Sequence, residues 1–107
     1  MAVEGAALVT GGARRLGRAM VLALAGRGHD VAIHYDRSAA EAEATAAEAR
    51  ALGVRAAVFQ ADLLDEAATA ALVPRVTAEL GPLGVLVNNA SIFEYDTLAS
   101  ATRESWD

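Results

Sequence analysis

The sequence predicts an α/β fold built on a parallel sheet. Two observations support this prediction: short apolar runs alternate with helical stretches, and each run is continuously apolar rather than alternating with polar residues. Strands that helices cover on both faces have this continuous pattern. The predicted strands are residues 6–9, 31–35, 55–60 and 85–88.

The stretches between the first three strands have helix signals. An amphipathic run begins at Leu16. The second helix begins at Ser38, which has the spacing of a capping box with Glu41, and it ends at Gly53. Alanine and glutamate dominate its interior, a good helix composition.

The third helix is predicted from Asp65 as N-cap to the neighbourhood of Gly81. Pro74 lies inside it and removes one backbone donor, so we expect a kink or two shorter helical pieces. Right-handed crossovers then place the strands in the order 3-2-1-4. This is the order of a Rossmann-like, doubly wound sheet.

A glycine-rich turn joins the first strand to the first helix. Residues 10–18 read Thr-Gly-Gly-Ala-Arg-Arg-Leu-Gly-Arg. Glycine lets the backbone reverse tightly, and the first N–H groups of a helix have no intrahelical partner and can bind a pyrophosphate. The turn therefore predicts a dinucleotide site at the switch point between the first and fourth strands. An ordinary glycine-rich turn between a strand and a helix is the alternative.

Composition excludes several other classes of protein. The chain has 107 residues, a net charge of −5 and 54% hydrophobic residues, which suits one modest domain. An acidic balance argues against nucleic-acid and anionic-membrane partners. The chain has no cysteine, no run long enough to span a bilayer and no secretory signal, so we expect a soluble, cytoplasmic protein without a metal site.

Three motifs in order resemble the cofactor half of the short-chain dehydrogenase/reductase family. They are Thr10-Gly11-x-x-x-Arg15-x-Gly17, Asp62-Leu63 and the Asn-Asn-Ala-Ser of residues 88–91. Arginine in the glycine turn and residues 34–41, His-Tyr-Asp-Arg-Ser-Ala-Ala-Glu, are similar to the pteridine reductase branch. The resemblance implies an NADPH-dependent oxidoreductase that reduces a pterin substrate by hydride transfer.

The resemblance also implies a set of cofactor-binding residues. In it, Gly11 and Gly17 allow close approach of the pyrophosphate, and Leu16 offers a backbone N–H while its side chain packs. Asp62 takes the adenine amino group or, alternatively, caps a helix. Asn89 lies against the ribose. The full set is Gly11, Arg14, Arg15, Leu16, Gly17, Tyr35, Arg37, Ser38, Asp62, Leu63, Asn89, Ala90 and Ser91.

The end of the second strand bears on the choice between NADPH and NADH. Asp36 suits a ribose 2′-hydroxyl, whereas Arg37 suits a 2′-phosphate. Arg37, Ser38 and the start of the following helix together make an anion site that Arg14 could also reach, which favours NADP(H).

Substrate contacts follow from the resemblance alone. Arg15 would bridge the cofactor phosphate and the polar edge of the pterin, Ser91 would hydrogen-bond that edge, and Phe93 would stack on the ring. Phe93 is equally well read as core packing.

No catalytic residue is predicted in this chain. The family's catalytic serine and Tyr-x-x-x-Lys pair would follow the fourth strand, but the tyrosines, Tyr35 and Tyr95, have no lysine four positions later, and the sequence has no lysine at all. His29 and His34 are expected to be surface or packing residues.

We therefore expect residues 1–107 to be the N-terminal part of a larger single dinucleotide-binding domain whose catalytic part is absent, leaving the chain inactive by itself. The family resemblance implies a homo-tetramer for the full-length protein. The alternatives are a noncatalytic nucleotide-binding module, a structural fragment, and a carbonyl reductase of the same family.

Overall fold

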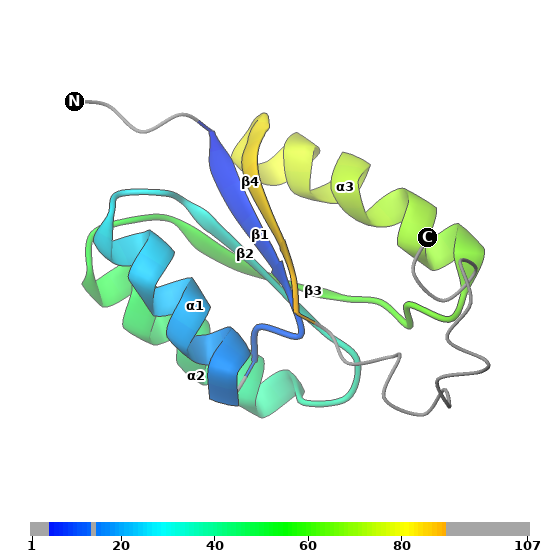
Figure 1. The fold of residues 1–107 in the computed structure, drawn as a ribbon, viewed down its shortest axis with the longest axis horizontal. Helices are drawn as coiled ribbons and strands as arrows, with labels where there is room; N and C mark the ends of the chain where they lie inside the picture. The colour runs from blue at the N-terminus through cyan, green and yellow to red at the C-terminus, as the bar shows by residue number, and fades with distance from the viewer. Residues whose placement is uncertain (1–4, 14, 90–107) are drawn as a thin grey trace, which may run out of the picture.

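A computed structural model of the chain describes residues 5–13 and 15–89 and contains a four-stranded parallel sheet with three helices (Figure 1). The elements in chain order are β1 (Ala6–Thr10), α1 (Arg15–Gly26), β2 (Val31–Tyr35), α2 (Ala39–Ala51), β3 (Ala56–Gln60), α3 (Glu66–Leu80) and β4 (Leu83–Asn88). The predicted alternation of strands and helices is confirmed.

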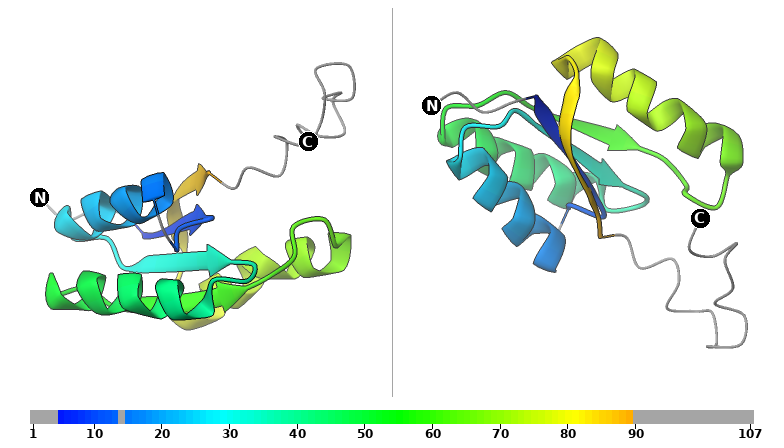
Figure 2. Two further views of the ribbon diagram at one scale, coloured as in Figure 1. Left: turned by 90° about the horizontal axis from the view of Figure 1, so that it is seen from below. Right: turned by 45° about the horizontal axis from the view of Figure 1, so that its top comes forward.

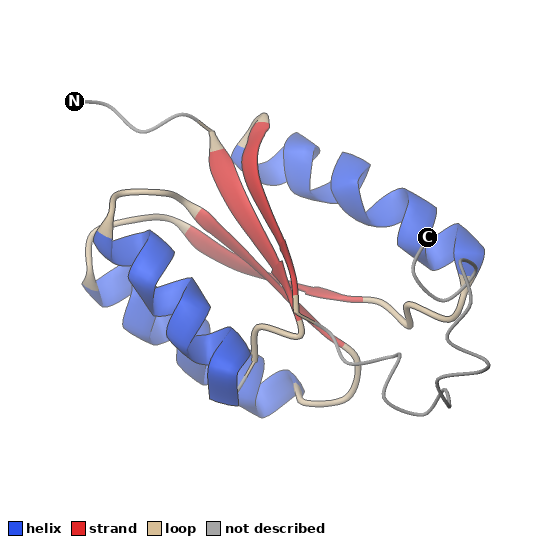
Figure 3. Cartoon of the chain, viewed as in Figure 1, coloured by secondary structure: helices blue, strands red, loops and turns tan. Residues whose placement is uncertain are grey.

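The sheet has the order β3-β2-β1-β4, and its neighbouring strands pair in parallel, as predicted (Figure 3). Helices α1 and α2 cover one face and α3 lies on the other (Figure 2). The core therefore has two halves: Ile33 and Val21 belong to the α1/α2 side, and Leu8 and Val76 to the α3 side. All five residues of β1 are buried, which explains its continuous apolar run.

Helix α2 begins and ends where the sequence predicts, but its start is built differently. Ser38 occupies the N-cap position with φ −96° and ψ 56°, and its side chain makes no cap hydrogen bond. The predicted capping box is therefore wrong, because a capping serine has an extended backbone that turns its hydroxyl to the N–H groups of the first turn. At the other end Gly53 has φ 98°, a left-handed conformation suited to glycine.

Helix α3 is a single element, so the prediction of two shorter pieces is wrong. Asp65 caps it as predicted, with its carboxylate accepting from the N–H groups of Ala67 and Ala68. The helix continues through Pro74 because Leu72 and Val76, on either side of it, are both buried in the core. Their burial outweighs the hydrogen bond that proline cannot donate.

Strand β4 begins at Leu83, two residues before the predicted start. It is an edge strand, and its residues alternate between half-buried and exposed. Leu86 pairs with Leu8 of β1, yet Leu86 is 59% exposed while Leu8 is 1% exposed. Strand β4 therefore leaves a large apolar side chain exposed at this edge of the sheet.

Candidate cofactor site

The predicted cofactor residues that the structure describes gather at the carboxyl edge of the sheet. The register pairs Thr10 with Asn88, so the glycine turn after β1 and the segment after β4 begin side by side. Figure 1 shows the β1–α1 turn, the β2–α2 turn and the end of β4 at this same end of the molecule. In an open α/β sheet this edge is where ligands bind.

Among its described residues, the glycine turn has two in the left-handed backbone region. Gly11 has φ 64°, which glycine adopts without strain. Arg15 has φ 58° and is the only non-glycine residue with positive φ within the described part of the chain. An L-residue in this conformation costs about 1–2 kcal/mol, and such strain gathers at functional sites. The backbone of Arg15 therefore holds this conformation at an energetic cost.

The start of α1 has the geometry of an anion site. Arg15, Leu16 and Gly17 are its first three residues, whose N–H groups have no intrahelical acceptor. The side chain of Leu16 is 62% exposed, so the expectation that it packs is wrong. It stands at the first turn of the helix, before the apolar face reaches the core at Val21.

Gly17 is required by the way α1 approaches the turn. A Cβ at this position would lie 2.0 Å from the carbonyl oxygen of Gly11 and 2.7 Å from Nδ2 of Asn89. No side chain fits there, so the helix starts directly against the turn. This is the close helix–turn packing that the glycine pattern predicts.

Strand β2 and helix α2 both hold the turn. His34 receives two N–H groups: Gly11 donates to its Nδ1 at 2.9 Å, and Gly12 donates to its carbonyl oxygen at 3.0 Å. From α2, the buried hydroxyl of Thr45 donates to the carbonyl oxygen of Ala13 at 2.7 Å.

The end of β4 provides a third set of hydrogen bonds to the turn, made by Asn89 and called here the Asn89 clamp. Asn89 donates from Nδ2 to the carbonyl oxygen of Gly11 at 3.1 Å, and its backbone N–H donates to Oγ1 of Thr10 at 2.9 Å. Thr10 in turn donates to Oδ1 of Asn88 at 3.0 Å. Asn88 thus has a structural role at the end of the strand. Asn89 therefore joins the two motif-bearing loops.

Asp62 and Leu63 follow β3 at the same edge. Asp62 is exposed and accepts from the N–H of Leu64 at 2.9 Å, which forms a local turn. The helix cap belongs to Asp65, so the alternative reading of Asp62 as the cap is wrong. Leu63 is half-buried against the α3 side of the core.

The β2–α2 turn presents a free guanidinium. The side chain of Arg37 is 93% exposed, and its Nε lies 4.0 Å from Oδ2 of Asp36, which is a weak contact in water. Asp36 is held by Gln60, whose Nε2 donates to the Asp36 carbonyl oxygen at 3.1 Å. Tyr35 is half-buried. Arg37 is therefore available to an incoming anion.

Four residues of the predicted site lie outside the described residues: Arg14, Ala90, Ser91 and Phe93. Within residues 5–13 and 15–89 no group of His, Asp or Glu side chains could hold a metal ion, and no helix is both long and apolar enough to cross a membrane.

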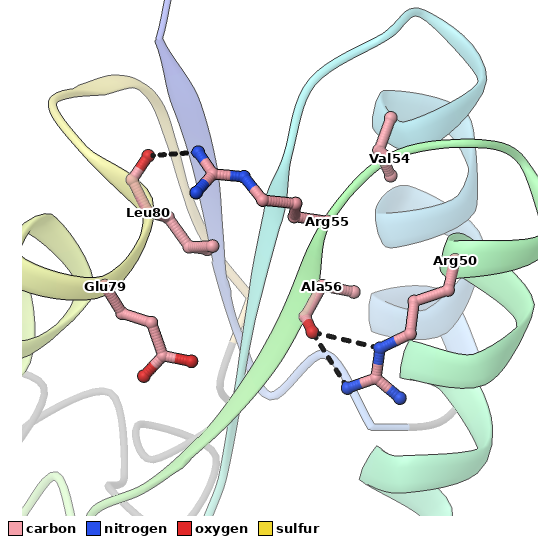
Figure 4. Close-up of a pocket in the computed structure, with 6 residues that line it drawn as sticks. All are labelled: Arg50, Val54, Arg55, Ala56, Glu79 and Leu80. Carbon is pink, nitrogen blue, oxygen red and sulfur yellow. Dashed lines mark hydrogen bonds between the residues drawn. The ribbon is translucent and has the colours of Figure 1, made fainter.

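An open pocket of about 500 Å³ lies at the opposite edge of the sheet (Figure 4). It is lined by Arg50, Val54, Arg55, Ala56, Glu79 and Leu80. Arg50 donates to the carbonyl oxygen of Ala56, and Arg55 donates to that of Leu80. The guanidinium groups of both arginines are thus already engaged in hydrogen bonds to the backbone.

Sequence reasoning missed two residues that shape the site, His34 and Thr45. Both are buried, with 2% and 1% exposure. His34 is a packing residue as expected, but it also makes hydrogen bonds through both ring nitrogens. Burial lowers its pKa, opposed by the hydrogen bond to Ala61 and by the charge of Asp36. A histidine within an apolar strand and a threonine within an alanine-rich helix were the available signals.

Comparison with known proteins agrees with this geometry. The short chain dehydrogenase family profile matches residues 5–107. The chain therefore belongs to the short-chain dehydrogenase/reductase family. It is 38% identical over 107 residues to the 3-oxoacyl-[acyl-carrier-protein] reductase FabG of Staphylococcus aureus, and it spans 44% of that protein's length.

Solved structures give the same architecture. A short chain dehydrogenase from Burkholderia cenocepacia in complex with NADP aligns with a TM-score of 0.80 and 46% identity, over 94% of this chain and 41% of that one. FolM alternative dihydrofolate reductase 1 from Brucella suis, also in complex with NADP, aligns with a TM-score of 0.78 and 43% identity, over 95% and 42%.

Proposed function

We propose that these residues form the cofactor half of an NADPH-dependent reductase that acts on a pterin. The observation that carries the proposal is the glycine turn, held from β2, α2 and β4 against the open N-terminus of α1. A turn fixed in advance loses little entropy when a dinucleotide binds, so its N–H groups act as a preorganised pyrophosphate site.

Each cofactor residue has a proposed task. The N–H groups of Arg15, Leu16 and Gly17 bind the pyrophosphate, and Gly11 gives it room. Asp62 and Leu63 receive the adenine, while Asn89, Ala90 and Ser91 line the path toward the ribose and nicotinamide. Bound NADPH would supply the hydride.

Three features favour NADPH over NADH. Arg37 is almost fully exposed and only weakly engaged by Asp36. Ser38 stands at the N-cap of α2 with its side chain not used as a cap, so its hydroxyl is available to a phosphate. By the family resemblance, Tyr35 and Arg14 complete this proposed site. The two solved structures named above are complexes with NADP, at 43% and 46% identity.

The pterin assignment depends on Arg15. Its left-handed backbone is a costly place for a side chain, which fits a guanidinium that contacts both the phosphate and the substrate edge. Ser91 and Phe93 would complete this pocket. The Brucella relative, described as an alternative dihydrofolate reductase, supports a substrate of this class.

The family's catalytic tyrosine and lysine are assigned to sequence beyond these 107 residues. On this proposal the chain alone is inactive, and the full-length protein is a cytoplasmic homo-tetramer. An intact-mass measurement of the natural protein tests the point: a mass well above 11.0 kDa is expected, and a mass equal to it would leave only nucleotide binding.

Exchange of Arg37 tests the cofactor assignment. In the full-length protein, Arg37→Asp should weaken NADPH binding by about tenfold or more and leave NADH binding nearly unchanged, because only NADPH presents the 2′-phosphate. Arg27→Asp, an equal charge change at an exposed residue after α1, is the matched control. Equal weakening of both cofactors by Arg37→Asp would contradict the assignment.

A second candidate is a 3-oxoacyl reductase, favoured by the 38% identity to the Staphylococcus enzyme. Turnover of dihydrobiopterin and of a 3-oxoacyl thioester with NADPH separates the two. The pterin proposal expects turnover of the pterin and a strong loss with Arg15→Gly. Preference for the thioester, insensitive to Arg15→Gly, supports the second candidate, and binding without any turnover supports a noncatalytic module.

A further inference from the structure

His34 connects two loops of the cofactor site through one buried ring. Its Nδ1 lies 2.9 Å from the N–H nitrogen of Gly11, and its Nε2 lies 2.8 Å from the carbonyl oxygen of Ala61. Gly11 begins the pyrophosphate turn, and Ala61 precedes the Asp62–Leu63 pair. The ring is therefore the one side chain within the described residues that hydrogen-bonds both loops.

The partners fix the tautomer of this ring. Gly11 offers an N–H, so Nδ1 must be an unprotonated acceptor, and Ala61 offers a carbonyl, so Nε2 must carry the proton. His29 has the reverse arrangement, because its Nδ1 lies 2.9 Å from the carbonyl oxygen of Gly5. The two histidines of the chain are thus expected to be opposite tautomers.

The contact to Gly11 acts on the residue where the backbone reverses. Gly11 has φ 64°, its carbonyl accepts from Asn89, and its N–H has His34 as acceptor. Without that acceptor the partly buried N–H would lose its partner or turn toward another one, which would displace the N–H groups that follow. The contact to Ala61 has no such effect on the turn.

We propose that His34 is a positioning residue for the dinucleotide: it holds the pyrophosphate turn in its binding conformation through Nδ1, while Nε2 serves only to anchor the ring. The inference rests on the proposed cofactor function of the turn. On this proposal, a buried residue of β2 contributes to the affinity for the cofactor without contacting it.

Two substitutions separate the roles of the two ring nitrogens. The carboxamide of His34→Asn ends near the position of Nδ1 and can accept from Gly11, whereas that of His34→Gln reaches the position of Nε2 and can donate to Ala61. Each variant keeps one hydrogen bond and loses the other, so each carries a comparable stability cost, which urea unfolding will measure.

Binding of NADP⁺ to the full-length protein, followed by calorimetry, gives the decisive comparison. His34→Asn should bind within about twofold of the wild type, and His34→Gln should bind about tenfold more weakly, the effect of one hydrogen bond lost from a positioned group. His29→Asn and His29→Gln, which change the other buried histidine at the opposite edge of the sheet, should both bind like the wild type.

Nitrogen NMR of the imidazole rings checks the premise directly. The proposal requires the Nε2–H tautomer at His34 at neutral pH, whereas the contact with the Gly5 carbonyl oxygen requires a proton on Nδ1 of His29. The opposite tautomer at His34, or equal affinity of His34→Asn and His34→Gln, overturns the inference. Failure of the wild type to bind NADP⁺ would instead overturn the proposed function, since no His34 variant is involved in that result.

Discussion

A Cβ on Gly17 would lie only 2.0 Å from the carbonyl oxygen of Gly11. The same oxygen accepts from the side chain of Asn89. One backbone carbonyl is therefore the point where the glycine turn, the first turn of α1 and the end of β4 meet. The atom that limits the space beside Gly17 belongs to the backbone, and a backbone atom cannot move aside as a side chain can.

Gly17→Ala should both destabilise the fold and abolish cofactor binding. The added methyl group forces α1 away from the turn, and overpacking against backbone costs at least about 2 kcal/mol. Urea unfolding and NADP⁺ binding measure the two effects. Gly26→Ala, at the other end of the same helix, meets no atom within 4 Å and should be neutral or slightly stabilising. A Gly17→Ala protein as stable as the wild type would refute this account of the turn.

Arg15→Gly should stabilise the protein while weakening its cofactor and substrate binding. Glycine adopts φ 58° without strain, so the free energy of unfolding should rise by about 1 kcal/mol. Arg15→Lys keeps both the strain and the charge, and its stability should match the wild type, although its single ammonium cannot form the paired contacts of a guanidinium. A less stable Arg15→Gly protein would show that the left-handed conformation carries no strain.

Acid should weaken the fold in two stages. Burial lowers the pKa of His34, so the unfolded chain takes up a proton below about pH 6.5 that the folded chain resists. The Arg55 backbone N–H, donating to Asp30, lowers the pKa of that carboxyl, so a second loss begins below about pH 4. In both cases stability is full above the window and falls as the pH drops through it.

The urea midpoint measured against pH checks this order. His34→Asn should flatten the upper stage alone, and Asp30→Asn the lower one alone. An upper stage that persists in His34→Asn would assign it to another group.

The fold was largely predictable because its signals are local or topological. Continuous apolar runs gave the four strands, and the handedness of crossovers gave their order, so the meeting of Thr10 and Asn88 followed without any contact being known. Asp65 and Gly53 were readable as helix ends because capping depends on residues a few positions away.

The rest depended on contacts across the chain. His34 meets partners 23 and 27 residues away, and Thr45 meets a carbonyl 32 residues away, so neighbouring residues carry no sign of either bond. Ser38 failed as a cap although its spacing to Glu41 was right, because spacing does not determine the backbone angles at the cap. The continuity of α3 through Pro74 likewise depended on the burial of neighbouring side chains, which a sequence pattern indicates only weakly.

The Asn89 clamp has a consequence for the order in which the protein matures. Asn89 reaches back 78 residues to Gly11, and loop closure over such a span is slow compared with formation of a helix or a local turn. A ribosome translates β1 and the glycine turn long before it reaches Asn89, so the nascent chain holds an incomplete nucleotide pocket for most of this segment's synthesis. On the proposed function, the cofactor would then bind only after β4 has joined the sheet.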